Sequence, residues 1–171
     1  GPRRVEMMHG DAHPGNFMLL PDDKMGVIDF GAVAPMSGGI PIEIGMAMRF
    51  ALNDDYDNLQ TAMQAIGFVQ KGEQVSKREM DEMMKQYVEP LEVEVFHYTR
   101  KWLQRITAMN MKPDRAAGQI KAARQMDVPA KLAIPMRVIA SNVAISCQLD
   151  AHVPAKRLAT ELIPGFAEEA A

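Results

Sequence analysis

The sequence is poor in cysteine and contains no apolar run of membrane-spanning length. Cys147 is the single cysteine among 171 residues, which excludes an intramolecular disulfide and is typical of a reducing compartment. The uncharged stretch of residues 138–149 carries serine, asparagine and glutamine, and it falls short of the roughly 18–20 apolar residues of a membrane span. Residues 1–11 lack the apolar segment of a signal peptide. We therefore expect a cytoplasmic protein whose contact with a membrane is at most peripheral.

An excess of basic residues is also missing. The chain has 19 basic and 22 acidic residues, and its formal net charge is −3. Because a surface that follows a phosphate backbone needs a basic excess, this balance excludes an ordinary nucleic-acid binder. Residues 1–60 hold 4 basic and 9 acidic groups, so the acidic surplus lies in the first third of the chain. A bound cation would be favoured there.

Turn residues and apolar periodicity predict a small β-hairpin followed by helices. Phe17–Leu20 is a short apolar strand, Pro21–Lys24 supplies the turn, and Met25–Ile28 is the return strand. Beyond it, apolar residues recur at helical spacing and predict six or seven helices over residues 40–171. The expected fold class is α+β, predominantly α-helical, with one hairpin at the front.

Individual helices are marked by caps at their starts and by glycine or proline at their ends. Asp57 is predicted to cap a helix that stops at Gly67, and Ser76–Glu79 forms a capping box for the next. The remaining predicted helices, in chain order, run from Leu91 to Met109 with His97 inside, from Asp114 to about Met126, from Pro129 to about Leu149 with a bend at Pro135, and from Pro154 to Pro164.

Groups suited to a metal ion and a phosphate are concentrated in residues 9–31, which read HGDAHPGN, then the hairpin, then IDFG. Asp11 is a carboxylate in the first loop, Asn16 offers an amide oxygen before the first strand, and Asp29 ends the second strand. Because a hairpin brings its two ends together, Asn16 and Asp29 should lie side by side. One carboxylate and one amide oxygen, with positions left for water and phosphate oxygens, commonly hold Mg²⁺.

The spacing matches the catalytic loop and metal-binding aspartate of protein kinases. Asn16 follows Asp11 by five residues, and Asp29 follows Asn16 by thirteen. In that arrangement Asp11 orients and deprotonates the acceptor hydroxyl, while Asn16 and Asp29 hold metal ions. Phe30 and Gly31 complete the DFG motif on the nucleotide side.

Two histidines flank Asp11 and have different expected roles. His13 stands where typical kinases carry lysine, and as a weaker, pH-dependent cation it could donate a hydrogen bond to the transferred phosphate. His9 is expected to support the loop backbone. An alternative interpretation takes His9, Asp11 and His13 as a zinc cluster, but this needs further ligands, and the other histidines lie far along the chain at positions 97 and 152.

HGDAHPGN together with IDFG resembles two related groups of proteins. One comprises small-molecule phosphotransferases of the aminoglycoside and choline kinase type, and the other is the UbiB-type atypical kinase-like family. Residues 54–69 (DDYDNLQTAMQAIGFV) and 136–154 (MRVIASNVAISCQLDAHVP) resemble UbiB-type helical segments. The chain as a whole is thus similar to the C-terminal lobe of a UbiB-type protein.

This resemblance implies a kinase-like C-lobe over residues 1–171, with the catalytic loop, hairpin and DFG in residues 9–31 and a helical subdomain in residues 40–171. It also implies Mg²⁺ and ATP or ADP as cofactors, an ATPase or atypical kinase activity, and a lipid or ubiquinone-pathway partner. No nucleotide loop, strand lysine or Lys-x-Gly-Gln segment lies in residues 1–8 or downstream. Without that N-lobe we expect a poor enzyme. A small-molecule phosphotransferase and a non-catalytic scaffold or pseudokinase lobe remain the alternatives.

Overall fold

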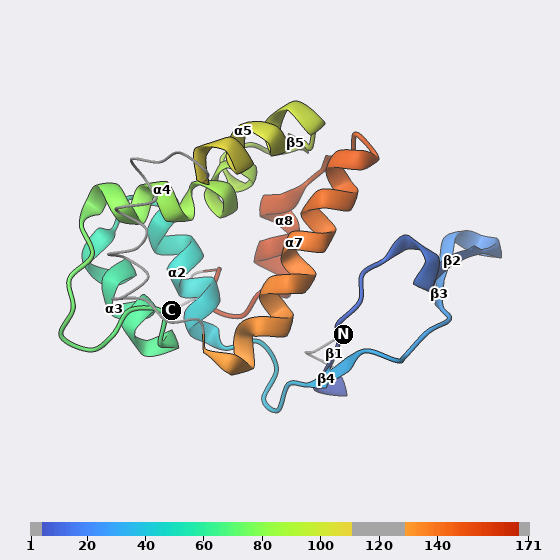
Figure 1. Cartoon of the computed structure of the whole chain (residues 1–171), viewed down its shortest axis with the longest axis horizontal. Coiled ribbons are helices and arrows are strands. Elements are labelled where there is room, and N and C mark those ends of the chain that lie inside the picture. Colours follow the sequence, from blue (N-terminus) through green and yellow to red (C-terminus); the bar gives the residue numbers. More distant parts are fainter. Residues whose placement is uncertain (1–4, 111–128, 168–171) are drawn as a thin grey trace.

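The structure is a computed structural model that describes residues 5–110 and 129–167. The helices gather in one body, and a two-stranded hairpin over residues 17–27 projects from one end of the molecule (Figure 1). The described strands form three two-stranded antiparallel sheets rather than the one hairpin that the sequence predicts. The α+β, mainly helical fold class is confirmed.

The front of the molecule consists of two nested strand pairs. β1 (Met7–His9) pairs with β4 (Val33–Pro35), and between them β2 (Phe17–Leu20) pairs with β3 (Lys24–Val27). The predicted hairpin is therefore confirmed, although its return strand begins one residue earlier than expected. Short 3₁₀ turns, η1 (Pro14–Asn16) and η2 (Pro21–Asp23), precede β2 and β3. The β1–β4 pair escapes prediction because strands of three residues are too short to show alternation.

Helices and two further strands make up the rest of the described chain. In chain order they are α2 (Ile42–Leu52), α3 (Tyr56–Ile66), α4 (Lys77–Val88), η3 (Glu89–Leu91), β5 (Phe96–His97), α5 (Arg100–Asn110), η4 (Ala130–Leu132), α7 (Ala133–Gln148), β6 (His152–Val153) and α8 (Ala155–Leu162).

The helix boundaries confirm most of the sequence signals but correct one cap. Asp55, not Asp57, caps α3, because its side chain accepts a hydrogen bond from the backbone N–H of Asn58. Gly67 ends the helix in the left-handed region with φ 94°, where glycine carries no steric cost. The capping box is confirmed, since Ser76 and Glu79 exchange both reciprocal hydrogen bonds.

Residues 92–99 are not helical, which corrects the helix predicted from Leu91 onward. Phe96 pairs with Val153 in the β5–β6 ladder, and the Phe96 ring packs edge-on against Trp102. This tertiary packing outweighs the apolar periodicity. His97 accordingly lies on a strand, where its ring stacks on that of His152 at 3.9 Å between centroids.

Two further helix predictions concern Pro135 and residues 114–126. Pro135 is the third residue of α7, so its missing N–H falls in the first turn, where no intrahelical partner is needed. The bend expected at Pro135 stays a prediction. The helix predicted from Asp114 to Met126 lies outside the described residues.

The main hydrophobic core lies between α2, α3 and α4, and Leu132 of η4 completes it. A second cluster joins α5 to α7 through Trp102, Ile106 and Cys147. Cys147 is 1% exposed, and burial raises the pKa of its thiol, so it behaves as a small apolar side chain as expected. α7 is thereby fixed to the helical body and offers its other face to the front loop.

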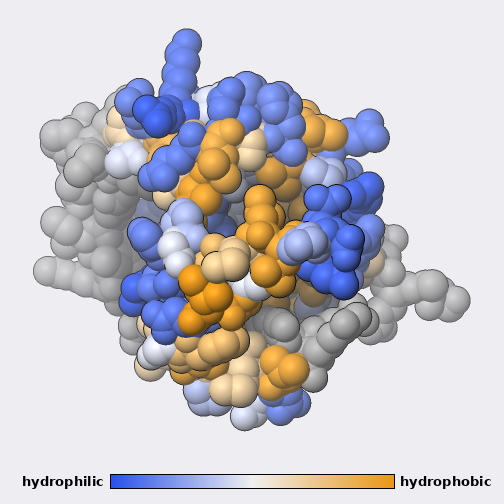
Figure 2. Space-filling view, turned by 90° about the vertical axis from the view of Figure 1, so that its right-hand side faces the viewer, coloured by the Kyte–Doolittle hydropathy of each residue, from blue (hydrophilic) through white to orange (hydrophobic). Residues whose placement is uncertain are grey.

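The hairpin and the residues that follow it expose many apolar side chains. Leu19 is 82% exposed and Phe30 is 68% exposed. Figure 2 looks onto the side from which the hairpin projects, and apolar side chains gather across the centre of this face. Within residues 5–110 and 129–167, no helix combines the length and apolar character required to span a membrane.

Candidate functional site

The β1–β4 pair brings the two ends of residues 9–31 together. His9 lies opposite Val33 in the ladder, and the next backbone contact runs from Gly10 N–H to the Ala32 carbonyl at 2.6 Å. The loop of residues 10–16 and the segment of residues 28–32 therefore leave the same short ladder and meet again at the hairpin. This closed arrangement places Asp11 and Asp29, which are distant in sequence, on neighbouring segments.

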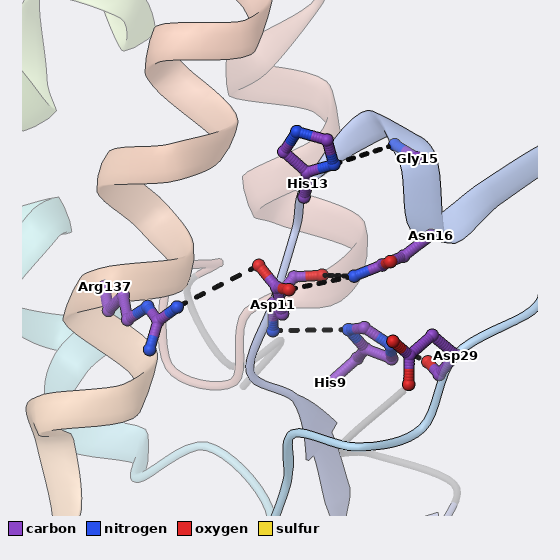
Figure 3. Close-up of polar contacts among 7 residues, drawn as sticks. All are labelled: His9, Asp11, His13, Gly15, Asn16, Asp29 and Arg137. Atoms are coloured by element: carbon purple, nitrogen blue, oxygen red, sulfur yellow. Dashed lines mark hydrogen bonds and ion pairs between the residues drawn. The ribbon is translucent and has the colours of Figure 1, made fainter.

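His9 links these two segments directly (Figure 3). Its Nδ1 accepts a hydrogen bond from the backbone N–H of Asp11 at 3.3 Å, and its Nε2 lies 2.5 Å from the Asp29 carbonyl oxygen. Since Nδ1 accepts, Nε2 carries the proton and donates it to the carbonyl. The His9 ring also packs against Phe17 and Phe30. His9 thus supports the loop, as the sequence predicts, and both of its nitrogens are occupied.

Asp11 and Asn16 are in direct contact. The Asn16 side-chain amide donates to the Asp11 carboxylate Oδ2 at 3.0 Å and to the Asp11 carbonyl at 3.2 Å. These bonds fix the carboxylate at the end of the loop and turn the Asn16 amide so that its nitrogen faces Asp11. The Asp11 side chain remains 42% exposed, so one side of the carboxylate is open to a substrate.

Asp29 lies in an exposed turn immediately after the hairpin. Its Oδ1 accepts a hydrogen bond from the Gly31 backbone N–H at 2.7 Å, which leaves Oδ2 available for another contact. A Cβ on residue 31 would lie 3.1 Å from the same Oδ1. Any side chain larger than that of glycine would therefore crowd the Asp29 carboxylate. The backbone N–H of Ile28 donates to the Asn16 carbonyl at 3.0 Å, which brings the chain beside Asn16 one residue before Asp29.

The donor set suits a hard cation such as Mg²⁺. Asp29 offers a carboxylate. The amide nitrogen of Asn16 is bonded to Asp11, so its amide oxygen is the group left for a metal ion. Carboxylate and amide oxygens, with water and phosphate, are the usual magnesium ligands. Among the described residues, no three His, Cys, Asp or Glu side chains are grouped to hold a metal ion. Together with the occupied nitrogens of His9, this counts against the zinc alternative.

His13 lies on the outer side of the loop, with its ring away from Asp29 (Figure 3). Its Nδ1 accepts a hydrogen bond from the Gly15 backbone N–H at 3.1 Å and so caps the short η1 turn. The structure therefore shows a local structural contact for this residue. The role of phosphate donor assigned to it from the sequence stays a prediction.

Arg137 of α7 is the residue at this site that sequence reasoning missed. Its Nη2 lies 3.9 Å from Asp11 Oδ1. The neighbouring backbone is tightly packed, because a Cβ on Gly10 would lie 3.2 Å from Cγ2 of Ile134 on α7. No local sequence signal joins position 11 to position 137. The resemblance of residues 136–154 to a UbiB-type helix is the one available indication.

Comparisons with known proteins found similar sequences and a similar structure. The sequence model of the phosphotransferase enzyme family (APH) matches residues 2–37. The protein ACTIVITY OF BC1 COMPLEX KINASE 1, chloroplastic, of Arabidopsis thaliana is 34% identical over 70 residues, which cover 41% of this chain and 10% of that protein. A solved structure described as the complex of Rv3197 with erythromycin, from Mycobacterium tuberculosis, is 65% identical, with a TM-score of 0.86, over 98% of this chain and 41% of that chain.

The chain spans less than half the length of these two relatives. The family model covers the loop, the hairpin and the DFG segment, and the solved structure matches almost the whole chain. The front segment of the chain is therefore similar to a phosphotransferase family, and part of the chain is similar to a kinase.

Proposed function

We propose that the chain is the Mg²⁺- and nucleotide-holding lobe of a UbiB-type atypical kinase or ATPase. The observation that carries the proposal is the His9 bridge, which ties the loop of Asp11 to the segment of Asp29 while Asn16 contacts Asp11. Phosphoryl transfer needs positioning and charge stabilisation more than covalent chemistry, and such a rigid set of oxygen groups supplies positioning.

Each residue has a distinct part in this function. Asp29 and Asn16 would hold Mg²⁺, and a bound Mg²⁺ would supply charge neutralisation at the phosphate oxygens. Asp11 faces the reacting phosphate, orients the attacking hydroxyl or water, and accepts its proton. Asn16 keeps the Asp11 carboxylate in place through its amide nitrogen. Phe30 and Gly31 shape the turn that carries Asp29.

The exposed hairpin is consistent with a second lobe in the intact protein. Apolar side chains on both strands and beyond are exposed, and an apolar patch of this kind usually marks an interaction surface. We propose that an N-lobe of the same protein, carrying the nucleotide loop, covers this surface. A cytoplasmic location and a lipid or quinone-pathway partner belong to the same proposal and derive from the resemblance.

Substitution of Asp29 tests the proposal. Asp29→Asn keeps the shape of the side chain but removes the charge that Mg²⁺ requires, so Mg²⁺–ADP should bind at least about 10-fold more weakly, a loss of about 1.4 kcal/mol. The measurement is a titration of the chain with Mg²⁺–ADP, followed by NMR because binding by a single lobe is expected to be weak.

Asp22→Asn is the matched control. Asp22 is an exposed acidic residue at the far end of the hairpin with φ 66°, a conformation that asparagine tolerates well. This control should bind Mg²⁺–ADP as the wild type does. Equal affinity of Asp29→Asn and wild type would contradict the proposal. Absence of nucleotide binding in the wild type would favour a non-catalytic scaffold.

A small-molecule phosphotransferase is the second candidate. The match to the phosphotransferase family and the complex of the Mycobacterium relative with erythromycin favour it. A cavity of about 220 Å³ between α4, α5 and α7, lined by Trp102 and Met136 among others, is smaller than the roughly 300–1,000 Å³ of drug-sized sites. Transfer of phosphate to erythromycin by the intact protein, detected by mass spectrometry, would decide for this candidate.

A further inference from the structure

We propose that Arg137 is the cation that meets the transferable phosphate beside Asp11, in the place that the sequence assigns to His13. The inference rests on the proposed function, because it needs a bound nucleotide with a terminal phosphate. It adds a residue from α7 to a site otherwise built entirely from residues 9–31.

The front segment is short of positive charge. Between residues 5 and 35, Lys24 is the one lysine or arginine, against five acidic residues. Lys24 pairs with Leu20 at the closed end of the hairpin, whereas Asn16 lies at its open end. At about 3.3 Å per residue, the four-residue strand keeps Lys24 about 10 Å from the open end. Apart from Mg²⁺, a cation for the terminal phosphate of a triphosphate at Asp11 would therefore have to come from a side chain outside residues 5–35.

His13 is engaged within its own loop in this structure. Its Nδ1 accepts the hydrogen bond from the Gly15 backbone N–H. Figure 3 shows the ring on the outer side of the loop, whereas Arg137 points from α7 toward Asp11.

Packing of the backbone fixes the position of Arg137. Gly10 is buried, and its missing side chain lets the loop approach Ile134 closely. Arg137 follows Ile134 by three residues, so the two share one face of α7. The direction from which the guanidinium reaches the loop is therefore set by the contact between α7 and Gly10.

The geometry of the Arg137–Asp11 pair would let the guanidinium leave the Asp11 carboxylate and bind a phosphate instead. The 3.9 Å between Arg137 Nη2 and Asp11 Oδ1 exceeds hydrogen-bond distance, and the Arg137 side chain is 66% exposed. Such an exposed pair is weak, so it costs little to separate. A guanidinium is permanently charged and can bind two phosphate oxygens at once.

A comparison of two nucleotides tests the inference. Mg²⁺–ADP and the Mg²⁺ complex of a non-hydrolysable ATP analogue are titrated into ¹⁵N-labelled wild-type chain and the variants R137Q, R137K, H13N and R157Q. Because only the ATP analogue carries the terminal phosphate, R137Q should weaken its binding about 10-fold and change ADP binding less than 2-fold. R137K should recover most of the loss, and H13N should change neither affinity by more than about 2-fold.

R157Q is the matched control, because Arg157 is an exposed arginine on α8 paired with Glu161, and this variant should behave as the wild type. Equal weakening of both nucleotides by R137Q would overturn the inference, as would a selective loss in H13N. Wild-type chain that binds neither nucleotide would overturn the proposed function, and with it the inference. The amide spectrum of each variant confirms that the fold is retained.

Discussion

His9 shows how one side chain can hold two distant segments in register. Its two nitrogens contact the backbone of Asp11 and of Asp29, and both contacts depend on a neutral imidazole with the proton on Nε2. The sequence predicts a supporting role for His9 from its place at the head of the loop. The partner on the Asp29 side follows only from the β1–β4 ladder, which the sequence does not reveal.

His9→Ala should loosen this connection. The Asp11 amide would lose its acceptor, so we expect its hydrogen exchange to accelerate by about 10-fold or more, while amides in α3 keep their protection. Hydrogen exchange followed by NMR measures both. His152→Ala, at the β5–β6 ladder, is the control and should leave the Asp11 amide unchanged. Unaltered Asp11 exchange in His9→Ala would show that the bridge contributes nothing to loop order.

At the scale of single elements, the sequence predicts structure correctly where the stabilising contacts join residues that are close in the chain. The hairpin, the Gly67 stop and the Ser76–Glu79 capping box depend on residues within a few positions of each other, and the structure confirms all three. In residues 92–99, by contrast, contacts with distant residues determine the structure. The apolar spacing of this segment suggests a helix, but packing of Phe96 against Trp102 and pairing with β6 prevail. Pairing between segments so far apart has no local signature.

The capping box gives a direct measure of such a local contribution. Ser76→Ala removes the acceptor for the Glu79 backbone N–H and should lower the free energy of unfolding by about 1 kcal/mol. Urea denaturation followed by circular dichroism measures the difference. Ser37→Ala, at an exposed loop position before α2, is the control and should lie within about 0.5 kcal/mol of the wild type.

For the whole molecule, the site is a junction between the front segment and the helical body. The sequence predicts the α+β fold class and the residues of the front segment, because motif and hairpin are contiguous. It does not predict Arg137, because the contact of α7 with Gly10 is a product of tertiary packing. The helical body therefore contributes to the site itself, because Arg137 of α7 lies beside Asp11.

The most direct test of this account is a map of the amides that respond when Mg²⁺–ADP binds to the wild-type chain. If the front segment holds the nucleotide, the largest NMR shift changes should fall in residues 9–16 and 28–31, with smaller changes near Arg137. The same titration without Mg²⁺ should give much weaker changes, because Asp29 and the phosphates would repel each other. Changes confined to the cavity between α4, α5 and α7, or changes independent of Mg²⁺, would contradict the account.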